Sequence, residues 1–148
     1  MSFNVAYLVG GILDRIRRLD KIEQPVRVEL PLYPTSPFDR PYSKGFRLEI
    51  PATEGSQTYF LEHVVTEEAQ LLSIEVGCTG YNDHDCWSFY IDGQPVCDAI
   101  YTKEVAQVKN LGAQPLSVGT VLRFEFANHS GTSKVAWLDI NFALRTQT

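Results

Sequence analysis

The 148-residue chain has few of the residues that usually carry chemistry: three cysteines, three histidines and one methionine. An odd cysteine count (Cys78, Cys86, Cys97) does not fit a disulfide framework, and a domain of this length does not need one. The cysteines have no Cys-x-x-Cys spacing, and a zinc site would need His84 as a fourth ligand. We therefore expect reduced thiols, no metal and no cofactor.

Long apolar runs and an excess of positive charge are also missing. The apolar stretch from Val5 to Leu13 is too short to span a membrane, and arginines follow it, whereas a secretory signal has them before it. The chain has 13 Lys and Arg against 18 Asp and Glu, for a net charge of −5. Acidic proteins repel phosphate backbones. We expect synthesis in the cytoplasm, and no membrane or nucleic-acid partner.

The common catalytic motifs are absent as well, with no GxGxxG, Walker loop or HExxH. His129, Ser130 and Asp139 suggest a catalytic triad, but adjacent residues in a flexible hairpin point apart and no Gly-x-Ser-x-Gly elbow exists. His63 falls among apolar residues of a strand, as a half-buried structural histidine would. The sequence predicts no catalytic residues and no enzyme.

One acidic loop, residues 81–87, concentrates Asn82, Asp83 and Asp85. Oxygen ligands at alternating positions suit Ca²⁺, but the spacing and the bidentate Glu of an EF-hand are missing. The aromatics that flank the loop could instead stack on a sugar. We expect a solvated turn here, and we expect Trp87 to lie in the core.

The best-formed pattern in the chain is a β-hairpin. Trp87, Phe89 and Ile91 alternate with polar residues, and Asp92-Gly93 then supplies a tight reversal before a second apolar run. Similar runs, each bounded by turn residues, predict strands near 46–50, 58–65, 71–78, 86–91, 96–100, 114–117, 121–128 and 135–144. About eight strands without a helical pattern predict an all-β fold, a jelly-roll-like antiparallel β-sandwich over residues 46–148.

The last strand has two distinct faces. Ala136, Leu138, Ile140 and Phe142 fall on one face, which we expect to be buried. Trp137 falls on the other face, where it lies under a loop or is exposed.

Two segments precede the predicted sandwich. Residues 1–24 place Leu8, Ile12, Ile16 and Leu19 near helical spacing, with charged residues on the other face. This pattern predicts an amphipathic helical arm from about Ile12 onward. Such an arm packs either on its own domain or against a neighbouring subunit, and we favour the neighbour.

Residues 25–45 form the second segment. A short alternating strand from Val26 to Leu30 is followed by four prolines among Tyr33, Phe38 and Tyr42. This composition predicts a stiff, extended connection without regular hydrogen bonding.

Several of these runs carry a resemblance to a known class of protein. They are Trp87-Ser-Phe-Tyr-Ile-Asp-Gly-Gln-Pro-Val, Ile100-Tyr-Thr-Lys-Glu, Leu122-Arg-Phe-Glu-Phe-Ala-Asn-His-Ser and Lys134-Val-Ala-Trp-Leu-Asp-Ile. From about Leu71 to Leu144 the chain resembles small β-sandwich proteins of tailed bacteriophages and prophages. The resemblance implies a non-enzymatic structural protein of the virion, in the capsid, neck or tail, that forms homo-oligomers and contacts other virion proteins.

The pattern of an aromatic strand, an Asp-Gly turn and an apolar strand is also similar to that of galactose-binding-like carbohydrate modules. A carbohydrate-binding or receptor-binding β-sandwich is therefore the alternative. Aromatic residues supply the candidate contacts for both functions: Tyr33, Phe38 and Tyr42 for subunit interfaces, and Tyr81, Tyr101 and Trp137 for sugars.

Overall fold

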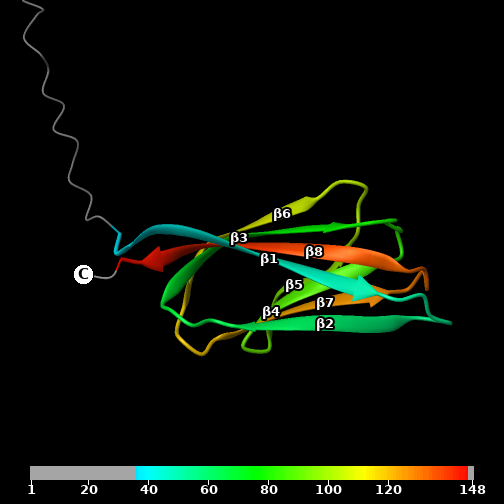
Figure 1. Cartoon of the computed structure of the whole chain (residues 1–148), viewed down its shortest axis with the longest axis horizontal. Helices are drawn as coiled ribbons and strands as arrows, with labels where there is room; N and C mark the ends of the chain where they lie inside the picture. The colour runs from blue at the N-terminus through cyan, green and yellow to red at the C-terminus, as the bar shows by residue number, and fades with distance from the viewer. Residues whose placement is uncertain (1–35, 147–148) are drawn as a thin grey trace, which may run out of the picture. The chain divides into compact units, whose positions relative to one another are not determined.

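The computed structural model describes residues 36–146, which form eight β-strands (Figure 1). These are β1 (Phe38–Ile50), β2 (Gln57–Val64), β3 (Ala69–Cys78), β4 (Cys86–Ile91), β5 (Gln94–Tyr101), β6 (Gln107–Leu116), β7 (Val121–Asn128) and β8 (Lys134–Arg145). The described part of the chain contains no helix that could cross a membrane. The predicted helical arm at 1–24 and the candidate contact Tyr33 lie outside the described residues.

The strands build two antiparallel sheets of four strands each, which face one another in Figure 1. One sheet has the order β1-β8-β3-β6 and the other has the order β2-β7-β4-β5. Apart from the β4–β5 hairpin, every connection crosses from one sheet to the other. The predicted all-β sandwich is confirmed.

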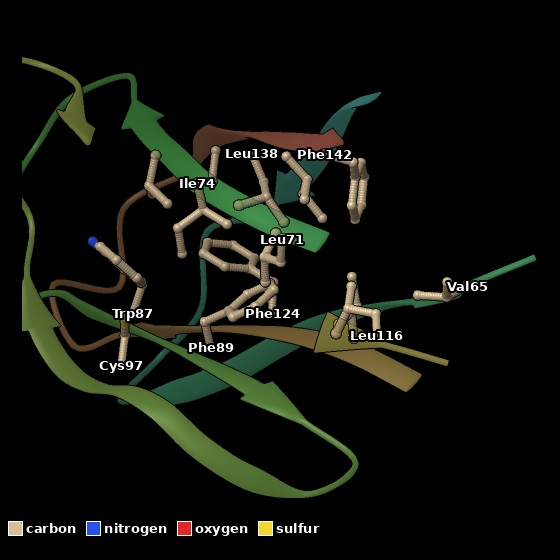
Figure 2. Close-up of a cluster of buried hydrophobic side chains, with 14 of the residues drawn as sticks. Val65, Leu71, Ile74, Trp87, Phe89, Cys97, Leu116, Phe124, Leu138 and Phe142 are labelled. Carbon is tan, nitrogen blue, oxygen red and sulfur yellow. The ribbon is translucent and has the colours of Figure 1, made fainter. Parts of the chain in front are cut away.

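The core lies between the sheets and comes from alternate residues of the strands. Figure 2 shows Leu71, Ile74 and Leu138 of one sheet facing Phe89 and Phe124 of the other. All five are at most 1% exposed, and burying each of them contributes roughly 1.5–3 kcal/mol. The inward faces of β4 and β8 are confirmed, because Trp87 and Ala136, Leu138, Ile140 and Phe142 are buried. Trp137 faces outward and is 42% exposed.

The predicted hairpin between β4 and β5 is also confirmed. Asp92 and Gly93 both have positive φ angles, 48° and 77°, as a two-residue turn that follows the twist of its strands requires. The Asp92 carboxylate accepts a 2.8 Å hydrogen bond from the Val121 N–H, and the Asp92 N–H donates to the Val121 carbonyl at 2.9 Å. The turn is thereby attached to β7.

Two strands differ from the prediction. β1 begins at Phe38 instead of Phe46, so an extended connection without regular hydrogen bonding is wrong for residues 38–45, which pair with β8. Pro41 misled the prediction, but β1 is an edge strand, and an edge strand tolerates proline where the missing N–H faces away from the neighbour. β6 begins at Gln107 instead of Gln114, because Gly112 and Ala113 with φ angles of 66° and 59° interrupt its alternation.

Candidate functional site

A fully buried ion pair lies where the β3–β4 loop meets the start of β8. Asp85 is the last residue before β4, and Lys134 is the first residue of β8. Both side chains are completely enclosed, and the Lys134 ammonium donates to an Asp85 carboxylate oxygen. The ammonium also donates to the Gly80 carbonyl at 3.2 Å and to Ser130 Oγ at 3.1 Å. The lysine therefore joins three segments of the chain.

The Asp85 carboxylate organises the β7–β8 loop. Its Oδ1 atom accepts the N–H groups of His129 and Ser130 at 2.7 and 2.8 Å, and its Oδ2 atom accepts the Ser130 hydroxyl at 2.9 Å. The expected solvated turn is wrong for Asp85, although Asp83 and His84 are exposed. The flexible hairpin predicted for the β7–β8 loop is also wrong, because the carboxylate holds His129 and Ser130.

The charge state of this pair follows from its contacts. Burial raises the pKa of the Asp85 carboxyl, but hydrogen bonds from Lys134 and Ser130 and the lysine charge outweigh it, so the pKa lies below its usual value. Removing either partner of such a pair would leave a buried charge without its counter-ion, so the two side chains depend on each other. The Lys134 ammonium is a hydrogen-bond donor to Ser130 Oγ.

A second polar group lies beside this pair. His129 Nδ1 is 2.6 Å from Ser56 Oγ, and His129 Nε2 is 3.9 Å from Cys86 Sγ. A thiol, an imidazole and a hydroxyl in this order resemble a nucleophile, a base and an orienting group. Burial raises the pKa of the Cys86 thiol, and the carboxylates of Asp85 and Asp98 raise it further. The thiol form is a weak nucleophile.

Neither polar group could be found from local sequence patterns. Asp85 and Lys134 are separated by 49 positions, and each follows an ordinary polar loop. The cysteines of the chain are all free, and within residues 36–146 no three His, Cys, Asp or Glu side chains gather as a metal site would require.

A small cavity of about 200 Å³ lies near the edge strands β1 and β2. Tyr42 lines it and stacks on Phe142, with ring centroids 6.1 Å apart and planes at 25°. Arg40, paired with Glu67, and His63 supply its polar groups. Burial and the nearby Lys44 lower the pKa of His63, which favours the neutral imidazole. The cavity is smaller than the roughly 300–1,000 Å³ of ordinary ligand pockets.

The predicted contact aromatics do not form one site. Phe38 is half-buried at the start of β1, and Tyr42 lies on the same strand at the cavity. Tyr81 is in the β3–β4 loop, Tyr101 ends β5 and Trp137 lies on the outer face of β8. Among residues 36–146, no ring–ring contact joins these last three.

Trp137 and its cross-strand neighbours, Arg47 on β1 and Gly77 on β3, form what we call the Trp137 patch on the sheet that contains β8. A Cβ atom at residue 77 would lie 3.9 Å from the indole ring, so the ring packs beside the Gly77 backbone. An exposed aromatic in such a place offers a stacking surface.

A family described as a domain of unknown function, DUF8551, matches residues 39–147. The match covers most of the chain and coincides with the sandwich, so the chain belongs to this family. No curated protein matches the sequence.

Proposed function

We propose that this member of the DUF8551 family is a non-enzymatic structural component of a tailed-phage virion, in the capsid, neck or tail. It is made in the host cytoplasm, assembles as a homo-oligomer and contacts other virion proteins. The observation that carries the proposal is the pair of apolar side chains exposed on β2, a strand at the open edge of its sheet. Phe60 and Val64 are 54 and 51% exposed. Exposed apolar side chains on an open, regular sheet edge favour association with another chain.

The strand order supports the same proposal. Two four-stranded sheets ordered β1-β8-β3-β6 and β2-β7-β4-β5, joined by connections that alternate between sheets, have the arrangement of a jelly roll. Viral capsid proteins and lectins both use this arrangement. The fold is therefore compatible with assembly and with sugar binding. Only the residues on the surface can favour one of these two functions over the other.

The polar clusters favour a scaffold over an enzyme. The hydrogen-bonding groups of Asp85, Lys134 and Ser130 are used within the subunit, and the Cys86 thiol beside them has a raised pKa. These contacts hold loops together, which supports a structural role for the cluster. A rigid sandwich that presents apolar strands is suited to repeated subunit contacts.

Two measurements test the proposal. Light scattering of the full chain over about a hundredfold range of concentration should give a mass above that of the monomer, rising with concentration. Peptides of the chain should also be present at constant stoichiometry in purified particles of a phage that encodes it. The proposal is contradicted if the chain is monomeric at every concentration and its peptides are absent from the particles.

A carbohydrate-binding module is the second candidate, and the Trp137 patch favours it. Trp87 is 1% exposed, so a sugar that changes the tryptophan fluorescence would report mainly on Trp137. Titration with neutral and acidic oligosaccharides should quench this fluorescence, and Trp137→Ala should abolish the response. A response that survives this substitution contradicts stacking on Trp137.

A further inference from the structure

The four edge strands of the two sheets differ in how they are protected against pairing. β1 contains Pro41, β5 contains Pro95 and β6 contains Pro115, and each of these strands has a register shift against its neighbour. β2 has no proline, and it pairs with β7 from Gln57–Asn128 to Val64–Val121 without a shift. Prolines, bulges and charges are the usual means by which soluble proteins block their sheet edges. β2 is therefore the one regular edge in the described part of the sandwich.

The hydrogen bonds around Val121 show which residues of β2 face the open side. The Val121 N–H and carbonyl both bond to Asp92, on the β4 side, so they do not bond to Val64 opposite. Alternate residues of an antiparallel strand direct their backbone groups to opposite sides. Thr58, Phe60, Glu62 and Val64 therefore direct their N–H and carbonyl groups away from β7. Their side chains are also exposed.

We propose that β2 pairs in antiparallel fashion with β2 of a second copy of this chain, which joins two four-stranded sheets into one continuous sheet. This interface rests on the assembly proposed above and specifies its first contact. The register is centred on Leu61, so that Thr58 lies opposite Val64 and Phe60 lies opposite Glu62 of the other copy. In this register every outward-facing residue of β2 has a partner. Shifting one copy by two residues in either direction leaves an outward-facing residue at the end of each strand unpaired.

The side chains on this face complement a second copy of themselves. Arg123 Nη1 is 3.2 Å from Glu62 Oε1, and the Arg123 guanidinium lies 4.1 Å from the centroid of the Phe60 ring. The register centred on Leu61 brings each Glu62 beside Phe60 and Arg123 of the other copy. The register that would place Glu62 opposite Glu62 opposes like charges, which destabilises a strand pair. The like charges thus disfavour one of the two shifted registers, and the unpaired end residues disfavour both. Together they favour the register centred on Leu61 and a second copy as the occupant.

The test compares two substitutions at one position in the full chain. Thr58→Pro removes an N–H that faces away from β7, so the subunit should remain folded while the edge is blocked. Thr58→Val keeps the N–H and the β-branched shape. In sedimentation velocity, Thr58→Pro should raise the dimer dissociation constant by at least about tenfold, and Thr58→Val should change it little.

The outcomes separate this inference from the general proposal. A full chain that associates equally well with Thr58→Pro overturns the β2 interface but leaves assembly through another surface. Amide exchange of the wild-type chain supplies a second measurement that does not depend on the variant folding. Protected amides at Phe60, Glu62 and Val64 in a protein that is monomeric at every concentration would show that another segment of the same chain, such as residues 26–30, covers the edge, and would overturn pairing with a second copy. Rapid exchange at every concentration would overturn it too.

Discussion

The buried Asp85–Lys134 pair and the β2 edge differ in whether their hydrogen-bonding groups have partners within the subunit. At the pair, the carboxylate, the ammonium and the nearby N–H groups all find partners within one subunit. Along β2, the outward backbone groups of Thr58, Phe60, Glu62 and Val64 have no strand beside them within residues 36–146. Unpaired backbone groups on a regular edge are open to a second strand. The first region therefore stabilises the fold, and the second is the edge at which we propose that two copies associate.

Breaking the ion pair should produce the largest effect. Lys134→Met leaves the Asp85 carboxylate buried without its cation, and removing one partner of such a pair typically costs about 3–5 kcal/mol of unfolding free energy. Urea unfolding would measure this loss. The control is Arg47→Ala, which removes an exposed pair with Glu49 and should cost less than about 1 kcal/mol. Equal, small losses for both variants would show that Asp85 and Lys134 do not brace the fold.

The two tryptophans offer a matched test of the core. Trp87 is buried and donates a 3.0 Å hydrogen bond to Gln107, so Trp87→Ala should cost roughly 3–5 kcal/mol through the cavity it leaves. Trp137→Ala on the exposed face should cost much less, about 1 kcal/mol or below. A loss below about 1 kcal/mol for Trp87→Ala would place its ring at the surface and contradict the packing in Figure 2.

Acid should weaken the packing around Asp85. The folded pKa of Asp85 is lowered, so its stabilisation is present above the unfolded pKa and is lost as the pH falls through the folded value. The urea concentration at the unfolding midpoint should therefore decrease when the pH is lowered below about 4. The double variant Asp85→Asn with Lys134→Met should flatten this dependence. An unchanged acid profile in the double variant would assign the dependence to other carboxyls.

The smallest effect concerns Cys86. Its raised pKa keeps the thiol protonated near neutral pH, so a thiol reagent should modify the native protein more slowly than the urea-unfolded chain. Mass spectrometry of timed reactions gives the rate at each of the three cysteines. Rapid, selective labelling of native Cys86 would indicate a thiolate activated by His129, and would contradict the proposal of a non-enzymatic protein.

The parts of the fold that could be predicted from sequence are those with strict alternation and clear turn residues. β4 and β7 have the predicted bounds because Trp87, Phe89, Phe124 and Phe126 repeat at every second position between polar turns. The start of β1 could not be predicted, because Pro41 is compatible with a strand only at a sheet edge, and edge position is a property of the assembled sheet.

The two polar clusters could not be predicted from local sequence patterns for a related reason. An aspartate before a strand has the same sequence signature whether it faces solvent or a lysine far along the chain. Asp85 meets Lys134, and Cys86 meets His129, only after β4, β7 and β8 are in place. Which residues of β2 face outward likewise follows from the hydrogen bonds between Val121 and Asp92. These contacts can be identified only once the arrangement of the strands is known.

Backbone amide exchange of the full chain at several concentrations tests assembly through β2 most directly. The amides of Thr58, Phe60, Glu62 and Val64 have no partner strand within residues 36–146, so a free edge would let them exchange quickly. We expect the protection of these amides to rise with protein concentration, in step with the dimer fraction from sedimentation. Exposed amides on the shifted strand β5 should stay unprotected. Rapid exchange along β2 in a sample that sedimentation shows to be associated would contradict assembly through β2.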